Sequence, residues 1–487
     1  MDSVLDPLTD RPAASAGPVS AHPVDARAHV VALLRRRWVP IVMTVAILVA
    51  GMVFEFAWIP LVYHQSRWFA QGDMWGMFRA AHYVGWGDLG GIYTTGNGVV
   101  TFPGLPVLLA PVAMLSGALN LTESYNPMLL AHPTAVFLLL PAELLMASTV
   151  VFAADALAEE FEMSKGRRAW LCVLVGLLAW PTAALWGHAE DALVMTFALL
   201  AMRAMLRGRW VRTGWLLGLA IVFQPLIALV FPLFLAASPR GQRLLFTARC
   251  AALSAFTVAV CFLGDPSGTY RSLVQQPTPP SLNHATPWVA LAPTVPNPAG
   301  LQRVGSTTSP SLGHGAFGDV TTAFHPGVNV SGGPGRMLYI LAAVLVAVYV
   351  WCRPQPPLRI LWLAAGILAA RCAFEAVMTP YYLVPPLVLL VVLAGRQSGR
   401  RFALAAVIGA AASIYSYYHL NEWVWWLPIV AAMAAVLALA YPGTGPVECD
   451  DAESGSVEFG RPRSAPVDDP GGSIADVVTR EESVSVG

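Results

Sequence analysis

Long apolar runs separated by short polar or basic turns make up most of the chain. A helix needs roughly 20 mostly apolar residues to cross a bilayer, and the sequence supplies many such windows. Because unpaired backbone groups are costly in lipid, segments of this kind are expected to be helical. The pattern predicts an all-α polytopic membrane protein with about 10–13 transmembrane helices. The expected spans are 38–62, 102–119, 133–154, 169–186, 189–206, 213–237, 244–263, 337–351, 358–378, 381–394, 402–419 and 423–441.

Basic residues recur in groups between these apolar runs. By the positive-inside rule all of the groups are expected to be cytoplasmic, and the arginines before the first run place the N-terminus in the cytoplasm. Arginine supplies nearly all of the basic charge, with Lys165 as the lysine, and alanine is abundant, which favours a bacterial plasma membrane. The groups lie at 35–37, 165–168, 207–212, 240–243, 353–359 and 396–401.

Two segments do not fit a simple alternation of inner and outer turns. Segment 213–237 has basic groups at both ends but the length of one span, so we expect two half-helices broken at Gln224-Pro225. Broken helices at membrane depth usually line a cavity. Segment 102–154 contains two apolar runs between an outer loop and a cytoplasmic basic group. The number of crossings agrees with these locations when one of the two runs is re-entrant.

The ends of the chain differ from the middle in composition. Residues 1–35 are rich in Pro, Ala, Ser and Asp and predict a disordered cytoplasmic tail, and 442–487 predict a disordered acidic tail. Between them, 36–441 form one membrane domain with outer loops at 63–101 and 264–336. Connections as long as the second loop are usually functional or disordered.

The composition also excludes several classes of function. The chain is 56% hydrophobic and 12% charged, whereas soluble domains carry about a quarter charged residues. Its zero net charge gives no reason to expect nucleic-acid binding. Six scattered cysteines without ligand spacing predict neither a disulfide framework nor a metal site, and fit small apolar packing residues. The absence of Walker A, GxSxG, HExxH and GxGxxG patterns argues against ATP-driven transport, serine hydrolysis, zinc proteolysis and nicotinamide chemistry, and no cofactor is expected.

The first candidate for chemistry is Asp73, about ten residues after the first span. Its segment is expected to form a short amphipathic helix on the outer surface, where a carboxylate against an aromatic-rich surface could have a raised pKa and act as a general base. The alternative is a solvated loop aspartate. Asp88 lies among glycines and is more typical of a turn. The aromatic residues expected in the interfacial belt are Trp68, Phe69, Trp75, Phe78 and Trp86.

A second cluster, His188, Glu190 and Asp191, lies in the sequence WGHAED at a predicted outer turn. Acidic residues there either cap the next helix or line a cavity. The pattern is too short to indicate a metal site. His419 and Glu422 lie at another outer turn and are interpreted as interfacial residues.

A third pair, Arg371 and Glu375, is spaced four residues apart and therefore shares one helix face. Glu375 is expected to form an intramembrane ion pair that ties helices together. Arg371, in the outer half of its span, is a candidate for holding a lipid phosphate. Tyr381 and Tyr382 follow and are expected to line the same opening.

The order of these features resembles the GT-C superfamily of membrane glycosyltransferases, and in particular the mannosyl- and arabinofuranosyltransferases of actinobacterial envelopes. The resemblance covers about residues 38–440. It rests on Asp73 in the first outer loop, then Tyr93, then the aromatic-proline step Phe102-Pro103 in TFPGLPVLLAP, and on the blocks WGHAEDALVMTFALL and PYYLVPPLVLL. Many relatives have Lys-Pro where this chain has Gln224-Pro225, so a phosphate-binding role is not carried over to Gln224.

The resemblance implies a GT-C-like bundle and a hexosyl- or pentosyltransferase. A polyprenyl-phosphate donor would give mannose or arabinofuranose to a cell-envelope glycolipid or polysaccharide on the outer face, with inversion and without a cofactor. Asp73 would be the general base, and loop 264–336 would help to cover donor and acceptor. The implied substrate-binding residues are Tyr93, His188, Glu190, Asp191, Arg371 and Tyr381.

Two other classes of function stay open on the sequence alone. A transporter or lipid or polysaccharide flippase would carry polar residues through to both faces, often with internal repeats. Here the polar clusters are predicted on one side. A non-catalytic assembly protein would tolerate a change at Asp73.

Overall fold

The structure is a computed structural model that describes residues 34–58, 72–94, 99, 101–121, 135–278, 284–295, 329–418 and 421–443. Nearly all of the two tails expected to be disordered, together with Trp68, Phe69 and His419, lies outside these ranges. So does most of the central part of loop 264–336.

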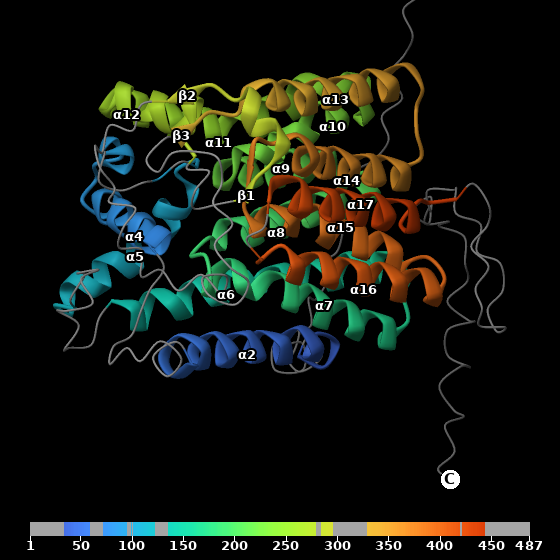
Figure 1. Ribbon diagram of the computed structural model, residues 1–487, viewed down its shortest axis with the longest axis horizontal. Coiled ribbons are helices and arrows are strands. Elements are labelled where there is room, and N and C mark those ends of the chain that lie inside the picture. Colours follow the sequence, from blue (N-terminus) through green and yellow to red (C-terminus); the bar gives the residue numbers. More distant parts are fainter. Residues whose placement is uncertain are drawn as a thin grey trace, which may run out of the picture. The chain divides into compact units, whose positions relative to one another are not determined.

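Helices account for most of the described chain (Figure 1). The α-helices are α2 (Trp38–Val53), α4 (Gly72–Gly85), α5 (Gly104–Ala118), α6 (Val136–Glu160), α7 (Lys165–Ala184), α8 (Ala189–Leu206), α9 (Trp210–Phe223), α10 (Phe231–Ala237), α11 (Arg243–Gly264), α12 (Pro266–Tyr270), α13 (Gly333–Cys352), α14 (Pro357–Phe374), α15 (Val384–Gly395), α16 (Gly399–Tyr415) and α17 (Glu422–Leu439). Short 3-10 or π-helical segments are η1 (Phe54–Trp58), η2 (Gly90–Tyr93), η3 (Pro225–Val230), η4 (Arg240–Gln242), η5 (Arg271–Gln275), η6 (Pro287–Leu291) and η7 (Pro380–Leu383). Two-residue strands are β1 (His284–Ala285), β2 (Thr294–Val295), β3 (Asn329–Val330) and β4 (Val377–Met378).

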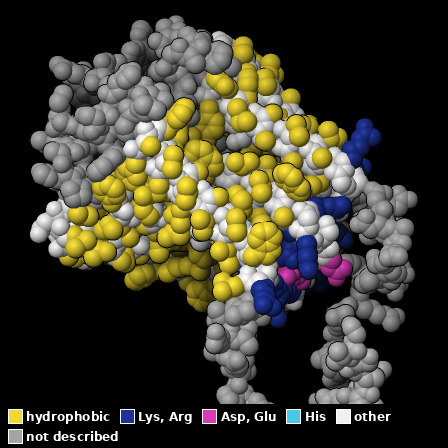
Figure 2. Space-filling model, turned by 90° about the horizontal axis from the view of Figure 1, so that it is seen from below, with side chains coloured by type: hydrophobic (Ala, Val, Ile, Leu, Met, Phe, Trp, Pro, Cys, Tyr) yellow, Lys and Arg dark blue, Asp and Glu magenta, His cyan; other side chains and the backbone are white. Residues whose placement is uncertain are grey.

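Among the described residues, six helical segments are long and apolar enough to cross a membrane. This confirms the predicted all-α polytopic membrane protein. Hydrophobic side chains cover the face in Figure 2, as expected for a surface that contacts lipid. The number of crossings stays a prediction, because several further apolar helices are shorter. The six segments are Trp38–Trp58, Val136–Glu160, Arg240–Gly264, Gly333–Cys352, Pro357–Phe374 and Glu422–Leu439.

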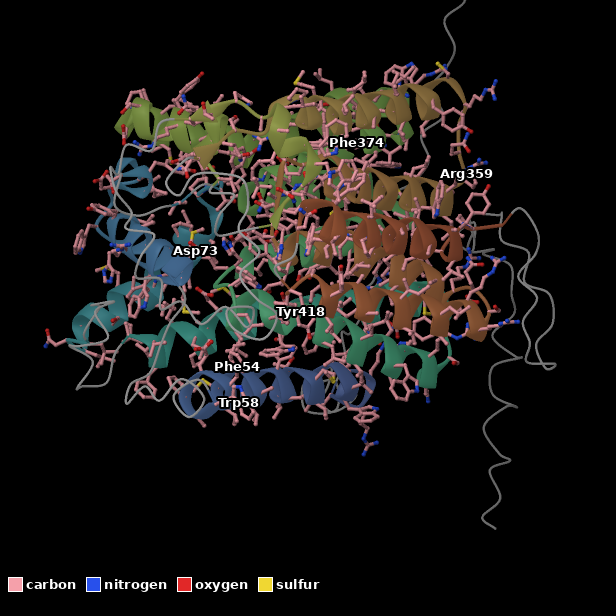
Figure 3. The ribbon with its side chains drawn as sticks, viewed as in Figure 1. Phe54, Trp58, Asp73, Arg359, Phe374 and Tyr418 are labelled. Carbon is pink, nitrogen blue, oxygen red and sulfur yellow. The ribbon has the colours of Figure 1, made fainter. Side chains whose placement is uncertain are left out.

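The long helices run side by side, and their basic turns lie together at one end. The α6–α7, α13–α14 and α15–α16 connections lie on the right in Figure 1, and Lys and Arg gather at one end of the apolar face in Figure 2. In Figure 3, Arg359 lies at this end and Asp73 lies toward the other. We call the two ends the basic end and the Asp73 end.

Burial separates central helices from peripheral ones. Every residue of α15 is buried, and α8 is buried on nearly all sides, because these helices are surrounded by others in the bundle. Helix α2 instead exposes Val42, Val45 and Val49 on one face. The residues at the start of α8 and α15 are therefore positioned by a packed interior rather than by a surface loop.

The predicted break at Gln224-Pro225 is confirmed. Helix α9 ends at Phe223, Gln224 is extended, and η3 begins at Pro225. A break leaves carbonyl groups without intrahelical partners. Thr101 satisfies one of them, donating from its hydroxyl to the Phe223 carbonyl at 2.9 Å. Gly104 packs directly on the neighbouring carbonyl, and an added Cβ there would lie 2.6 Å from the oxygen of Val222.

Segment 102–154 forms two unequal helices. Helix α6 has 25 residues and is long and apolar enough to cross a membrane, whereas α5 has 15 residues and is one of the shorter apolar helices. Helix α5 packs mainly against α4. The re-entrant position of one of the two runs stays a prediction.

Segment 63–101 contains the expected helix, α4, but Trp75 and Phe78 lie in a different environment from the predicted one. Trp75 and Phe78 are 4% and 0% exposed, so they pack inside the protein and not in the interfacial belt. The reason is that α5 lies along α4 and covers this face. Trp86, at 70% exposure, does fit the predicted interfacial position.

Ion pairs hold the N-terminal end of α2 to the basic end of α6. Arg37 and Arg168 both bind the carboxylate of Asp155, which is 2% exposed. Arg37 also reaches Glu159, at 2.7 Å. On the neighbouring helix, Arg207 pairs with Glu160 at 2.6 Å.

Part of loop 264–336 folds back against the helices at the Asp73 end. Strand β1 pairs antiparallel with β4, so that His284 lies opposite Met378. The ring of His284 stacks on Trp425 at 4.4 Å, and the hydroxyl of Thr286 donates to the Glu375 carbonyl at 2.6 Å. This attaches the loop beside the connection between α14 and α15.

Candidate functional site

Asp73 lies in the first turn of α4, and 62% of its side chain is exposed. The buried residues that follow it, Met74 and Trp75, fix the helix in the protein interior and leave the carboxylate at the surface. Gly187, in the turn before α8, lies against this point. Its φ is 67°, and a Cβ added there would lie 2.7 Å from the backbone nitrogen of Met74.

This close approach brings His188 to Asp73. Nε2 of the histidine lies 3.1 Å from Oδ2 of Asp73, and Nδ1 lies 2.5 Å from Oε1 of Glu190. His188 and Glu190 are both buried. The three residues form a continuous hydrogen-bonded row from an exposed carboxylate to a buried one. Oδ1 of Asp73 has no partner among the described residues.

The two carboxylates control the charge of His188, which lies in the turn between α7 and α8. Burial by itself lowers the pKa of His188, but the Glu190 and Asp73 carboxylates outweigh burial and raise the pKa well above the ordinary value of 6.5. At neutral pH the imidazolium can donate from both ring nitrogens at once. Donation from Nε2 fixes the orientation of the Asp73 carboxylate.

This shift makes the stability of the protein depend on pH. A histidine whose pKa is raised by folding stabilises the folded protein. This stabilisation is complete below the pKa of the unfolded state, about 6.5, and is lost as the pH rises through the pKa of the folded state. We expect wild type to unfold at a higher temperature than His188→Gln near neutral pH, and the difference to shrink as the pH becomes alkaline. Thermal unfolding of both proteins in the same detergent across this range measures it. A difference that is constant or grows with pH would contradict the assignment.

Tyr381 covers the other face of the His188 ring. The two rings stack at 4.2 Å with an angle of 26° between their planes. Tyr382 meets Tyr381 edge to face at 4.9 Å, and the guanidinium of Arg371 lies 3.6 Å from the centre of the Tyr382 ring. A row of aromatic rings therefore connects the Asp73–His188 pair to a buried cation.

Glu375 takes the structural role expected of it. Its carboxylate accepts from Tyr339 at 2.9 Å and from Arg336 at 3.2 Å, and lies 3.9 Å from Nε of Arg371. It therefore ties α13 to the end of α14. With two arginines around one carboxylate, this buried group carries an excess of positive charge.

Glu190 and Asp191 are buried and lie in the first turn of α8, where acidic side chains are favourable to the helix dipole. His188 occupies the cap position but makes no side-chain cap hydrogen bond, and the Glu190 carboxylate is bound to His188. The Asp191 carboxylate instead lies 3.5 Å from the amide nitrogen of Gln224, at the break after α9. Its charge also interacts with that of Arg371. The position of Glu190 and Asp191 fits the capping interpretation, and cavity lining stays a prediction.

Glu143 of α6 was not among the predicted site residues. It is completely buried, neither carboxylate oxygen has a hydrogen-bond partner among the described residues, and it lies within electrostatic range of Glu190 and His188. A carboxyl group inside the apolar run PAELLMAS was a usable signal, because ionisable residues within spans are rare and usually functional.

Tyr93 does not join this cluster. Its hydroxyl donates to the Thr101 carbonyl at 2.8 Å, and only 1% of the residue is exposed. Since Thr101 in turn holds the Phe223 carbonyl at the α9 break, Tyr93 braces the loop after α4. These contacts support a structural role, and the substrate-binding role implied by the resemblance stays a prediction.

His188, Glu190 and Asp191 offer ligand atoms within 4.8 Å of one another, a spacing that a metal ion could use. Both ring nitrogens of His188, however, are already bonded to Glu190 and Asp73. A metal would have to displace one of these carboxylates. The geometry is accounted for by hydrogen bonds, and the expectation of no metal stays a prediction.

The contact between Gly187 and Met74 predicts a steric requirement at the site. Gly187→Ala places a methyl group 2.7 Å from Met74 in addition to the strained left-handed backbone. We expect it to destabilise the protein by about 1–3 kcal/mol more than backbone strain alone. Gly208→Ala is the matched control, since Gly208 has a φ of 68° and no atom within 4 Å of the added Cβ. Equal thermal stability of the two variants would show that the close approach is unimportant.

Comparisons of the chain with protein-family models, with curated proteins and with solved structures found no match.

Proposed function

We propose that the chain is an integral membrane glycosyltransferase. It transfers a sugar, mannose or arabinofuranose, from a polyprenyl-phosphate donor to a glycolipid or polysaccharide of the cell envelope. Asp73 is the general base. The proposal rests on the arrangement at the Asp73 end together with the family resemblance of the early loop and of the blocks around His188 and Tyr381.

The main support for the proposal is the environment of the Asp73 carboxylate. One oxygen, Oδ2, is held by a buried histidine, and the side chain is otherwise open at the end of the bundle. A base must be fixed in position and still reachable by the proton that it removes. A simple solvated loop aspartate has no reason to be held in this way by a partner 115 residues away in the chain.

In the proposed reaction, the Asp73 carboxylate takes the proton of the acceptor hydroxyl while the hydroxyl oxygen bonds to the anomeric carbon of the donor. The bond between that carbon and the phosphate oxygen breaks, and polyprenyl phosphate leaves with the electron pair. Arg371, behind Tyr382, supplies positive charge that favours the departing phosphate. The sugar inverts, since no covalent enzyme intermediate forms.

The orientation follows from the separation of charges. The basic end faces the cytoplasm by the positive-inside rule, which places the N-terminus inside and Asp73 on the outer face. A lipid-linked donor reaches this face with its phosphate at the membrane surface.

Membranes from cells that produce the chain, supplied with radiolabelled polyprenyl-phosphate mannose or arabinofuranose, test the proposal. We expect label in an envelope glycolipid or polysaccharide with one of the donors, above that of membranes without the chain. If the folded protein transfers label from neither donor but moves labelled lipid across the bilayer, the chain is a flippase and the proposal is wrong.

A further inference from the structure

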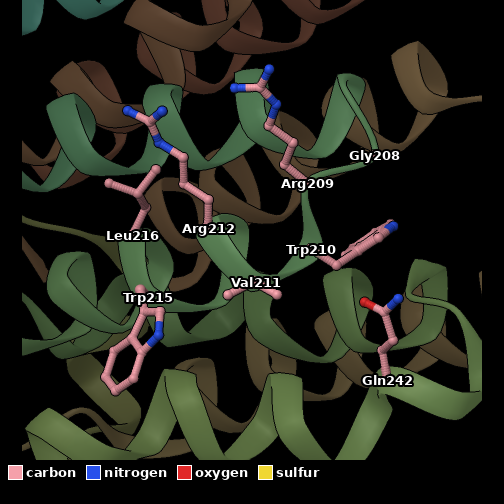
Figure 4. Close-up of a pocket in the computed structure, with 8 residues that line it drawn as sticks. All are labelled: Gly208, Arg209, Trp210, Val211, Arg212, Trp215, Leu216 and Gln242. Carbon is pink, nitrogen blue, oxygen red and sulfur yellow. The ribbon is translucent and has the colours of Figure 1, made fainter. Parts of the chain in front are cut away.

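A hollow of about 610 Å³ lies at the basic end, away from Asp73. Figure 4 shows the residues that line it. It is formed by the turn between α8 and α9, the first turns of α9 and Gln242 before α11. Arg209 and Arg212 are spaced three residues apart, and their side chains extend to the same side in Figure 4. Trp210, which meets Phe246 edge to face at 6.0 Å, forms another wall.

The charge in this hollow is not neutralised by the protein. Arg203 and Arg207, one turn earlier, are paired with Glu160. Arg209 and Arg212 have no ion-pair partner among the described residues, and no carboxylate lines the hollow. Two arginines three residues apart therefore carry a local charge that attracts an anion, and guanidinium groups match the geometry of phosphate.

The surroundings of the hollow are apolar and open to lipid. Val211 is 52% and Trp215 is 48% exposed, and the neighbouring Leu244 and Leu245 at the start of α11 are also exposed. Tryptophan at the end of a membrane helix is typical of the level of lipid headgroups. An anion held by the two arginines would thus lie at headgroup depth, with apolar surface beside it for acyl chains.

We propose that this hollow binds an anionic phospholipid, with its phosphate between Arg209 and Arg212 and its acyl chains along Val211, Trp215 and Leu245. Phosphate contact alone would also suit a free anion, but a free anion makes no use of the exposed apolar side chains around the hollow. The site is separate from the proposed sugar-transfer site, so either can be tested without the other.

The test compares lipid retained by purified protein. Wild type is reconstituted in mixed vesicles of phosphatidylglycerol and phosphatidylcholine, extracted in neutral detergent, and examined by native mass spectrometry for bound lipid. We expect preferential retention of phosphatidylglycerol. The Arg209→Gln/Arg212→Gln double variant is expected to lose about 25-fold in this preference, because each surface arginine contributes roughly fivefold to binding of an anionic lipid.

Arg400→Gln/Arg401→Gln is the matched control, since it removes two exposed arginines from α16, which contributes no residue to the hollow. Equal loss in both double variants, or equal retention of both lipids by wild type, would overturn the proposal. So would release of the bound lipid by millimolar inorganic phosphate, which would identify a free-anion site. If the test variant fails to fold, the salt dependence of wild type decides: retention that falls with salt supports the arginine contact, and retention independent of salt refutes it.

Discussion

Replacing Asp73 with asparagine should reduce sugar transfer by about 10²–10⁴-fold, the usual contribution of a general base. Asparagine has nearly the same shape and keeps an oxygen that can accept from Nε2 of His188, so α4 should remain in place. What it loses is the ability to take a proton from the acceptor hydroxyl. The rate of label transfer in membranes, normalised to the amount of folded protein, measures the effect.

Asp88→Asn is the matched control for this experiment. Asp88 is an exposed carboxylate shortly after the same helix, and its Oδ1 accepts from the backbone nitrogen of Gly91 at 3.1 Å. Asparagine preserves that bond, so transfer should stay near the wild-type rate. Transfer that survives in Asp73→Asn would remove Asp73 from the mechanism. Equal loss in both variants would point to a general effect of charge on this face.

Replacing Asp155 with asparagine should lower the free energy of unfolding by about 3 kcal/mol. This value is toward the lower end of the range observed when one partner of a buried ion pair is removed. Asp155 is shared by Arg37 and Arg168, and each of the two arginine side chains is less than a fifth exposed. Without the carboxylate, two partly buried cations face each other across the start of α2, and Glu159 is the carboxylate that still pairs with them in the described part of the chain. The thermal unfolding temperature in detergent measures the loss.

Glu162→Gln provides the comparison, because Glu162 is an exposed acidic residue in the α6–α7 turn. We expect its unfolding temperature to stay close to that of wild type. A stability of Asp155→Asn equal to that of Glu162→Gln would mean that the ion pairs at the basic end do not hold α2 in place. Transfer activity per folded molecule should be unchanged in both variants, since Asp155 lies at the end away from Asp73.

The membrane fold could be predicted from the sequence because the bilayer imposes a simple rule on long apolar runs. The break at Gln224-Pro225 could be predicted for a related reason, since proline cannot continue a helix without losing a backbone hydrogen bond. What the sequence does not contain is the group that repairs the break. Thr101 lies 122 residues away and meets Phe223 only because α5 packs beside α9.

The candidate site was predicted in its parts but not in its connections. Asp73 and His188 were each recognised as ionisable residues near predicted spans, but their hydrogen bond depends on the contact of Gly187 with Met74, which is set by tertiary packing. Local pattern also misassigned Trp75. An aromatic residue on an amphipathic helix looks the same in sequence whether lipid or another helix covers it.

The most direct test of the central claim is a balanced measurement on purified protein in liposomes. With one radiolabelled polyprenyl-phosphate sugar and an envelope glycolipid acceptor, both the glycosylated product and the released polyprenyl phosphate are quantified over time. The proposed reaction predicts that they appear in equal amounts with wild type, and that both form about 10²–10⁴-fold more slowly with Asp73→Asn. Folded wild-type protein that forms no product from either donor, or product formed at an equal rate by both proteins, would contradict it.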